Sequence, residues 1–198
     1  SKGTLAVMLP MIASVAEVRQ VRAMLDIAVA ETGAETGADA PLLGVMIETP
    51  AAAMTADILA PAIDFVSIGT NDLTQYALAM DRQNPHLAAQ LDSLHPAVLR
   101  LIAQAVKGAA STRWIGVCGG LASDPLAAPI LVGLGVTELS ATPSMVAEIK
   151  AVVRSLSLSA CRELSAEALR LDSAEAVRAL AAERLAGAMK SHAVGAVA

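Results

Sequence analysis

The sequence predicts an α/β protein built on a parallel sheet, and three observations carry that prediction. Short apolar segments alternate with helical patterns about five times along the chain, as in repeated strand–helix units. Most of the apolar segments are continuous rather than alternating, which is typical of strands buried on both faces. No glycine-rich phosphate turn follows the first segment, which ends in Leu9-Pro10-Met11-Ile12. A (β/α) barrel is therefore favoured over a doubly wound sheet.

The individual elements follow from local signals. Strands are expected at residues 4–9, 42–48, 64–68, 114–118 and 137–140. Helices are expected after a Ser14–Glu17 capping box and after the proline-containing starts at 49–50, 95–96 and 124–125, because such residues satisfy or tolerate the free N–H groups of a first turn. Further helices are expected over 73–80 and from Pro143 to Arg154, with a loop at 32–40.

Five strand–helix units do not complete a barrel. A (β/α)8 TIM barrel needs eight strands and usually about 250 residues, whereas this chain has 198. We expect it to supply about the last five units, as a barrel part over 1–154, followed by a helical tail over 155–198. Within the tail, similar segments at 165–170 and 173–178 predict two helix starts, residues 172–190 predict an amphipathic helix, and the last residues are expected to fray.

Composition excludes several classes of function. The net charge is −5 with a pI near 5.1, and no Lys/Arg block stands out, which argues against a nucleic-acid partner. No apolar run reaches the roughly 18 residues of a membrane span, and the first residues do not resemble a secretory signal. The two cysteines, Cys118 and Cys161, give no disulfide framework. The expected location is the reducing cytoplasm.

Polar residues with metal- and anion-binding character follow two neighbouring strands. Glu48 ends one predicted strand, and Asn71 and Asp72 follow the next. Because neighbouring parallel strands end at the same edge, two carboxylates there could share a Mg²⁺ ion, which prefers one or two carboxylates plus substrate oxygens. The alternatives are a solvated acid at the strand end for Glu48, and turn formation or helix capping for Asn71 and Asp72.

Two further residues could take part in chemistry at this edge. Arg82 could clamp an anion if it folds back toward Asn71; otherwise it only meets the dipole at the end of a helix. Cys118 ends a predicted strand and is followed by two glycines. A thiol there is protonated at neutral pH and could donate a proton, although a buried, inert cysteine fits the same position. Cys161 is assigned no role.

These segments resemble one family. The matching motifs are VMIETPAA (45–52), FVSIGTNDLTQY (65–76), Asp81-Arg82 and GVCG (116–119). They are similar, in order and position, to the phosphoenolpyruvate-utilising enzymes, which include Enzyme I of the bacterial sugar phosphotransferase system, phosphoenolpyruvate synthase and pyruvate phosphate dikinase. The resemblance covers residues 4–154. The Tyr76 segment, residues 8–12 and the short spacing look most like Enzyme I, and residues 118–125 are similar to multiphosphoryl fusion forms that serve fructose uptake.

The resemblance implies a phosphotransferase that moves the phosphoryl group of phosphoenolpyruvate to a histidine and then to the carrier protein HPr. Glu48 and Asp72 match Mg²⁺ ligands, while Asn71, Asp72 and Arg82 match phosphoenolpyruvate-binding positions. Cys118 matches the proton donor that forms pyruvate. The family also dimerises through this barrel, so a homodimer is expected.

The chain departs from the family pattern in two ways. Gly120 stands where many Enzyme I sequences have Glu. The phosphorylated-histidine domain, the HPr-binding helices and the first three strands are absent, which implies a fragment that is inactive alone. The alternatives are a synthase- or dikinase-type domain, an autonomous Mg²⁺-dependent lyase that acts on a pyruvate-like substrate, and a catalytically inert dimerisation module.

Overall fold

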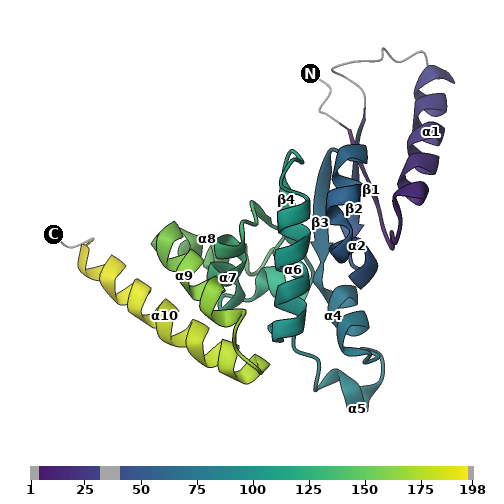
Figure 1. Cartoon of the computed structure of the whole chain (residues 1–198). Coiled ribbons are helices and arrows are strands. Elements are labelled where there is room, and N and C mark those ends of the chain that lie inside the picture. The colour runs from purple at the N-terminus through teal and green to yellow at the C-terminus, as the bar shows by residue number, and fades with distance from the viewer. Residues whose placement is uncertain (1–4, 32–40, 196–198) are drawn as a thin grey trace.

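The computed structural model, which describes residues 5–31 and 41–195 with side chains to residue 189, has one five-stranded sheet (Figure 1). Its strands are β1 (Ala6–Leu9), β2 (Leu42–Ile47), β3 (Phe65–Gly69), β4 (Ile115–Cys118) and β5 (Glu138–Leu139). Each strand pairs in parallel with the next one along the chain. This order confirms the predicted fold class, a partial α/β barrel. The predicted loop 32–40, the start of the first strand at Thr4 and the frayed last residues lie outside the described residues.

Helices connect the strands and form the tail. Between β1 and β4 lie α1 (Val15–Glu31), α2 (Pro50–Met54), α3 (Ala56–Leu59), η1 (Ala60–Ala62), α4 (Thr70–Leu78), α5 (Pro85–Ala88) and α6 (Pro96–Gly108). After β4 come η2 (Gly120–Ser123), α7 (Ala127–Leu134), α8 (Val146–Ser155), α9 (Leu158–Ala168) and α10 (Ala174–Gly195). Among the described residues, no helix combines the length and the apolar character that a membrane span requires.

The helix-start chemistry agrees with the sequence at several positions. The Glu17 carboxylate accepts the N–H groups of Ala13 and Ser14. The side chains of Thr49 and His95 accept N–H groups from the first turns of α2 and α6, at 3.1 Å in both cases. Local capping therefore fixes where these helices begin.

Two expectations about helix starts are wrong, and one helix whose end was not predicted is interrupted. The helix expected over 73–80 begins at Thr70, which moves Asn71 and Asp72 into its first turn. The helix that starts at Pro50 breaks at Thr55, whose hydroxyl donates to the Ala51 carbonyl. Ser165 starts no helix, because α9 already begins after the Ser157 cap and Ser165 donates to the Arg162 carbonyl inside it.

The core lies between one face of the sheet and the helices that cover it. Leu43, Val45 and Ile47 on β2 alternate with residues of the other face and are fully buried, while Met46 and Ser67 on that other face are half-buried. Helices α2 and α6 cover the buried face (Figure 1). The sheet therefore has one closed face, and its carboxyl-terminal edge lies beside the starts of α2 and α4.

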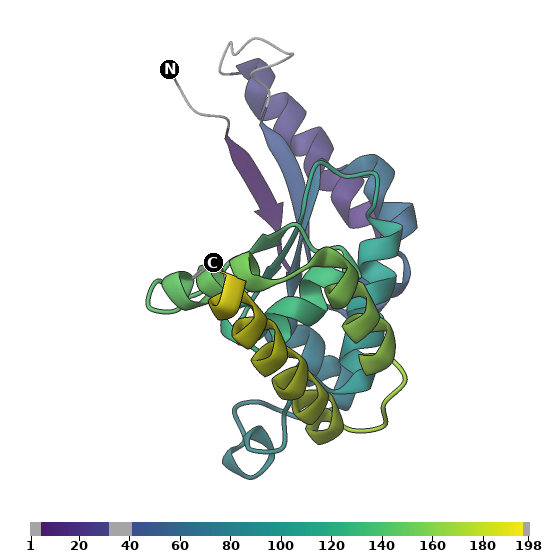
Figure 2. The same ribbon diagram turned by 90° about the vertical axis from the view of Figure 1, so that its left-hand side faces the viewer.

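The tail helices pack on the same core rather than standing apart. Figure 2 shows α10 crossing the side of the molecule opposite α1, and its residues Val177 and Ala181 are fully buried in the main apolar cluster. Helices α7 and α9 approach so closely that a Cβ at Gly133 would lie 2.0 Å from the Cys161 carbonyl oxygen. The Arg100 guanidinium donates to the Leu169 carbonyl at 2.9 and 3.0 Å.

Candidate functional site

Glu48 follows β2 directly and is held in a fixed position. Its side chain is only 4% exposed, so it is not a solvated acid at the strand end. Its Oε1 accepts the Met11 N–H at 2.7 Å, and Met11 has a left-handed backbone with φ of 55°. A Cβ at Gly69 would lie 2.8 Å from Glu48 Oε2. The carboxylate of Glu48 therefore lies against the end of β3.

Asn71 and Asp72 lie in the first turn of α4, immediately after β3. An acidic residue there is favoured by the exposed N–H groups of the helix start. Asn71 Oδ1 accepts the Gly120 N–H at 2.9 Å, which links α4 to the segment after β4. Asp72 Oδ2 lies 3.1 Å from Arg82 Nη1. The two side chains thus have different neighbours, one toward β4 and one toward Arg82.

Arg82 folds back along α4 instead of meeting its carboxyl end. Helix α4 ends at Ala79, which has a left-handed backbone with φ of 52°. The chain then reverses, and the Arg82 N–H donates to Gln75 Oε1 at 3.1 Å. This places the guanidinium beside Asp72, where the two side chains are 42% and 24% exposed. An ion pair this exposed contributes about 0–1 kcal/mol, so Arg82 can exchange it for an anionic ligand at small cost.

Cys118 is the last residue of β4 and pairs in register with Gly69. It is a half-buried free thiol. Its carbonyl accepts the Thr70 hydroxyl at 2.8 Å. The next residue, Gly119, has φ of 84°. At Gly120, by contrast, a Cβ would meet only Asn71 Oδ1, at 3.6 Å, so local packing leaves room for a side chain at this position.

The oxygen donors at this edge suit a hard cation. Among the described residues, no group of three or more His, Cys, Asp or Glu side chains could hold a metal, but Mg²⁺ often takes one or two carboxylates and completes its shell with substrate oxygens and water. Glu48 Oε2 and Asp72 Oδ1 accept no hydrogen bond within the described chain, and no buried side-chain oxygen there lacks a partner. Each carboxylate thus has one oxygen that is not used in a described hydrogen bond, and such oxygens fit a Mg²⁺ ion.

Sequence reasoning missed three residues that shape this site. Thr70 was inside the motif, but nothing in the sequence showed that its hydroxyl reaches the Cys118 carbonyl. Gly69 gives Glu48 its space, and Met11 donates to Glu48 from 37 residues away. Only the Gly-Thr-Asn-Asp run offered a signal for the first two, and Met11 offered none.

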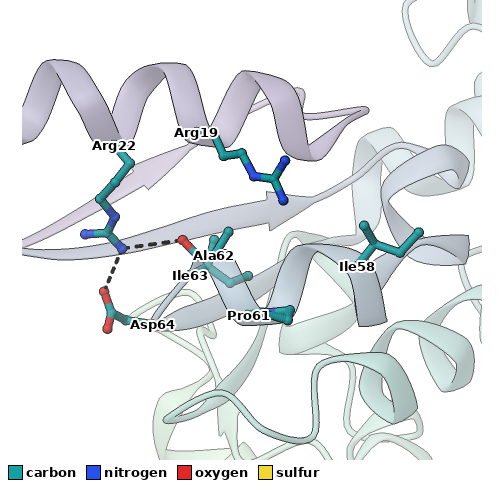
Figure 3. Close-up of a pocket in the computed structure, with 7 residues that line it drawn as sticks. All are labelled: Arg19, Arg22, Ile58, Pro61, Ala62, Ile63 and Asp64. Carbon is teal, nitrogen blue, oxygen red and sulfur yellow. Dashed lines mark hydrogen bonds and ion pairs between the residues drawn. The ribbon is translucent and has the colours of Figure 1, made fainter.

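A pocket of about 510 Å³ lies at the opposite end of β3, between α1 and the α3–η1 segment (Figure 3). Arg22 Nη2 lies 3.2 Å from Asp64 Oδ2 and 3.5 Å from the Ala62 carbonyl, and Asp64 also accepts the Leu43 N–H. Burial alone would raise the pKa of Asp64, but this N–H, Arg22 and Arg113 together lower it. The amino-terminal face of a (β/α) barrel serves stability, and this network joins α1 to the sheet there.

Comparison with known proteins shows the family of the chain. The family described as "PEP-utilising enzyme, PEP-binding domain" matches residues 1–158. The chain is 55% identical over 157 residues to the multiphosphoryl transfer protein of Xanthomonas campestris pv. campestris, covering 79% of this chain and 18% of that protein. It is 51% identical over 158 residues to the multiphosphoryl transfer protein of Rhodobacter capsulatus, covering 79% of this chain and 19% of that protein.

A third relative, with a different name, matches the same part of the chain. The phosphoenolpyruvate-protein phosphotransferase of Haemophilus influenzae is 44% identical over 158 residues, covering 78% of this chain and 28% of that protein. The chain therefore spans less than a third of the length of these relatives. The matched region holds β1 to β5 with Glu48, Asn71, Asp72, Arg82 and Cys118. The chain belongs to the phosphoenolpyruvate-binding domain family of the phosphoenolpyruvate-utilising enzymes.

Proposed function

We propose that this chain is the phosphoenolpyruvate-binding part of an Enzyme I-type phosphoenolpyruvate-protein phosphotransferase. The phosphoryl group of phosphoenolpyruvate would pass to a histidine in another part of a longer protein, and then to HPr in sugar uptake. The observation that carries this proposal is the meeting of three groups at neighbouring strand ends: Glu48 after β2, Asp72 with Arg82 after β3, and Cys118 at the end of β4. The names of the relatives support the same reaction class.

The anion would be held by side chains of α4 and the segment after it. Arg82 offers a planar guanidinium to carboxylate or phosphoryl oxygens, and the Asn71 amide N–H₂ remains available because its oxygen accepts the Gly120 N–H. Glu48 and Asp72 would hold Mg²⁺, which supplies neutralising charge to phosphoryl oxygens. Glu48 is fixed by Met11 and Gly69 and needs little rearrangement to do so.

Cys118 would complete the reaction as an acid. When the phosphoryl group leaves, the P–O bond breaks and its electrons stay on the enol oxygen. Carbon then takes the thiol proton as the C=C electrons move to it and the C=O bond forms, which gives the methyl group of pyruvate and leaves a thiolate.

The assembly and location of the protein are part of the proposal. We infer a homodimer, as the family resemblance implies. In this chain alone, the free edge of β1 and the exposed apolar side chains Leu5 and Met8, at 61% and 39%, would also favour association. A clean monomer in light scattering at micromolar concentration would reject it. We place the protein in the cytoplasm, where its two free cysteines stay reduced.

Calorimetric titration of phosphoenolpyruvate into this chain, with and without Mg²⁺, tests the binding function. We expect binding that depends on Mg²⁺, is lost in Asp72→Ala and is weakened in Glu48→Gln. The matched control is Asp81→Ala, which removes an exposed carboxylate of the loop after α4, where its described side-chain contact is the Gln83 N–H. That variant should bind as the unaltered chain does.

The outcomes of this titration distinguish the proposed function from its alternatives. Binding that survives Asp72→Ala, or that is equally lost in Asp81→Ala, would reject the assigned metal and anion site. No binding by a folded chain would reject an autonomous phosphoenolpyruvate site and favour an assembly module. Release of pyruvate from a 2-keto-acid adduct by the isolated chain would favour the lyase alternative.

A further inference from the structure

The segment Cys118-Gly119-Gly120 is held on both sides by two consecutive residues of α4. The Thr70 hydroxyl donates to the Cys118 carbonyl at 2.8 Å. The Asn71 side-chain oxygen accepts the Gly120 N–H at 2.9 Å. The two bonds flank Gly119, so the backbone on either side of this glycine is tied to the start of α4.

Only glycine fits at position 119. Its φ of 84° is the left-handed region that favours glycine. A Cβ at this position would lie 2.6 Å from Thr70 Oγ1 and 2.9 Å from Asn71 Oδ1. The glycine therefore lets the segment press directly against the two side chains that hold it.

Thr70 is in turn immobilised by its own surroundings. It is fully buried, and its carbonyl accepts the Thr74 hydroxyl at 2.6 Å. The Thr74 hydroxyl oxygen lies 2.8 Å from Ser93 Oγ. These hydrogen bonds hold the Thr70 backbone at the start of α4. Its buried hydroxyl therefore starts from a fixed position and can support the end of β4.

We propose that Thr70 is a positioning residue for the Cys118 thiol. By holding the Cys118 carbonyl, it sets the backbone torsions that aim the thiol toward the edge where Asn71 and Asp72 lie. Asn71 contributes the second tie, so one side chain links the anion site to the segment that carries the acid. The catalytic part of this inference rests on the proposed function, whereas the support of the segment rests on the contacts alone.

The test is the alkylation rate of Cys118 by iodoacetamide in this chain, followed by peptide mass spectrometry. Thr70→Val removes the hydroxyl at nearly constant volume and leaves the Cys118 carbonyl without its donor. We expect the segment to open more often, and Cys118 to react about five-fold faster, as the loss of one hydrogen bond predicts. Thr70→Ser keeps the hydroxyl and should react within about two-fold of the unaltered chain.

Two controls separate local release from general loosening. Thr112→Val removes a hydroxyl that donates to the Ala109 carbonyl at 2.8 Å, beside the opposite end of β4, and should leave Cys118 unchanged. Cys161 is only 1% exposed and lies in a different tryptic peptide, since Lys150 and Arg154 separate the two cysteines. Global loosening would speed both thiols, whereas local release speeds Cys118 alone. If Thr70→Val does not fold, Thr70→Ala removes the same hydroxyl with a smaller side chain.

An unchanged or slower Cys118 rate in the folded valine or alanine variant would overturn the proposal, as would equal acceleration in Thr112→Val. The phosphoenolpyruvate titration on the same variants distinguishes this failure from failure of the proposed function. A faster thiol with retained, Asp72-dependent binding supports both. A faster thiol in a chain whose unaltered form does not bind phosphoenolpyruvate supports the positioning role and rejects the binding function.

Discussion

Arg178 offers a test of how the tail helix α10 stabilises the loops near the candidate site. Its Nε and Nη2 donate to both carboxylate oxygens of Asp92, at 2.5 and 2.9 Å. Its Nη1 donates to Asp124 Oδ2 at 2.9 Å. Asp92 precedes α6 and Asp124 follows the segment after β4, so one guanidinium joins three separate parts of the chain.

Replacing Arg178 with Ala would leave two carboxylates facing each other without their cation. The guanidinium is 39% exposed and the carboxylates are 26% and 21% exposed. Exposed pairs contribute about 0–1 kcal/mol, and breaking a buried pair costs about 3–5 kcal/mol. Arg178 with its two carboxylates, called here the Arg178 hub, is half-exposed and lies between these limits. We expect a loss of about 2 kcal/mol in the free energy of unfolding. With a urea slope of about 2 kcal/mol per molar, the midpoint would fall by about 1 M.

The assay is urea unfolding followed by the fluorescence of Trp114, the one tryptophan of the chain, whose ring stacks on Phe65. The matched control is Arg184→Ala on the same helix, whose bond to Glu167 joins side chains that are 46% and 40% exposed. That variant should lose less than about 1 kcal/mol. Equal effects of the two variants would refute the argument that Arg178 is a hub.

The same hub predicts a pH dependence. Burial would raise the pKa of Asp92, but hydrogen bonds from Arg178 and the Leu94 N–H, with the charges of Arg178 and His95, together lower it below its usual 3.8. A carboxyl with a lowered folded pKa stabilises the protein fully above its unfolded pKa, and this stabilisation is lost as pH falls through the folded value. Below about pH 4, the stability gap between the unaltered chain and Arg178→Ala should therefore shrink. A gap that stays constant down to pH 2 would contradict this assignment.

Three further predictions test separate parts of the structure. Gly133→Ala should lower the free energy of unfolding by about 3 kcal/mol or more, because its Cβ would lie 2.0 Å from the Cys161 carbonyl oxygen. The control Gly187→Ala on α10, whose Cβ would meet no described atom within 4 Å, should raise it by about 0.5–1 kcal/mol. Equal urea midpoints would refute the close α7–α9 contact. Asp64→Asn removes the ion pair with Arg22 and should reduce the loss of stability below about pH 4; an unaltered acid limb of the thermal unfolding profile would contradict this. In the double variant Thr70→Val with Arg178→Ala, the fold increase in the Cys118 alkylation rate should exceed the product of the two single-variant increases. Each change alone leaves one end of the 118–124 segment tied. An increase equal to that product would show that the two ties act independently.

The parts of the fold that the sequence predicted are those set by local chemistry. Apolar runs marked all five strands, and capping residues such as Thr49 and His95 marked helix starts within a residue or two. Ser165 shows the limit of that reasoning. The same serine–acid pattern that caps α10 at Ser173 lies inside α9 at Ser165, because a helix already under way can satisfy the N–H groups that a cap would otherwise accept.

The arrangement of the candidate site depends on contacts between residues distant in sequence. The motif named Asn71, Asp72 and Arg82, but the return of Arg82 to Asp72 requires the left-handed Ala79 and the Gln75 side chain. Alanine carries no local signal for a left-handed backbone. In the same way, a sequence pattern shows that Glu48 ends a strand, but it cannot show that Met11 donates to Glu48.

The segment from Cys118 to Asp124 is held at both ends by helices from other parts of the chain. Its first residue is tied to Thr70 of α4, and its last to Arg178 of α10. Near its end, Ser123 Oγ also accepts the Thr142 N–H at 2.9 Å. Arg178 lies beyond residue 158, where the family match ends. The proposed site residues thus lie in the family motifs, while the segment that carries the proposed acid is also held by the tail. A change at Arg178, far along the chain from Cys118, should therefore be measurable in the reactivity of that thiol.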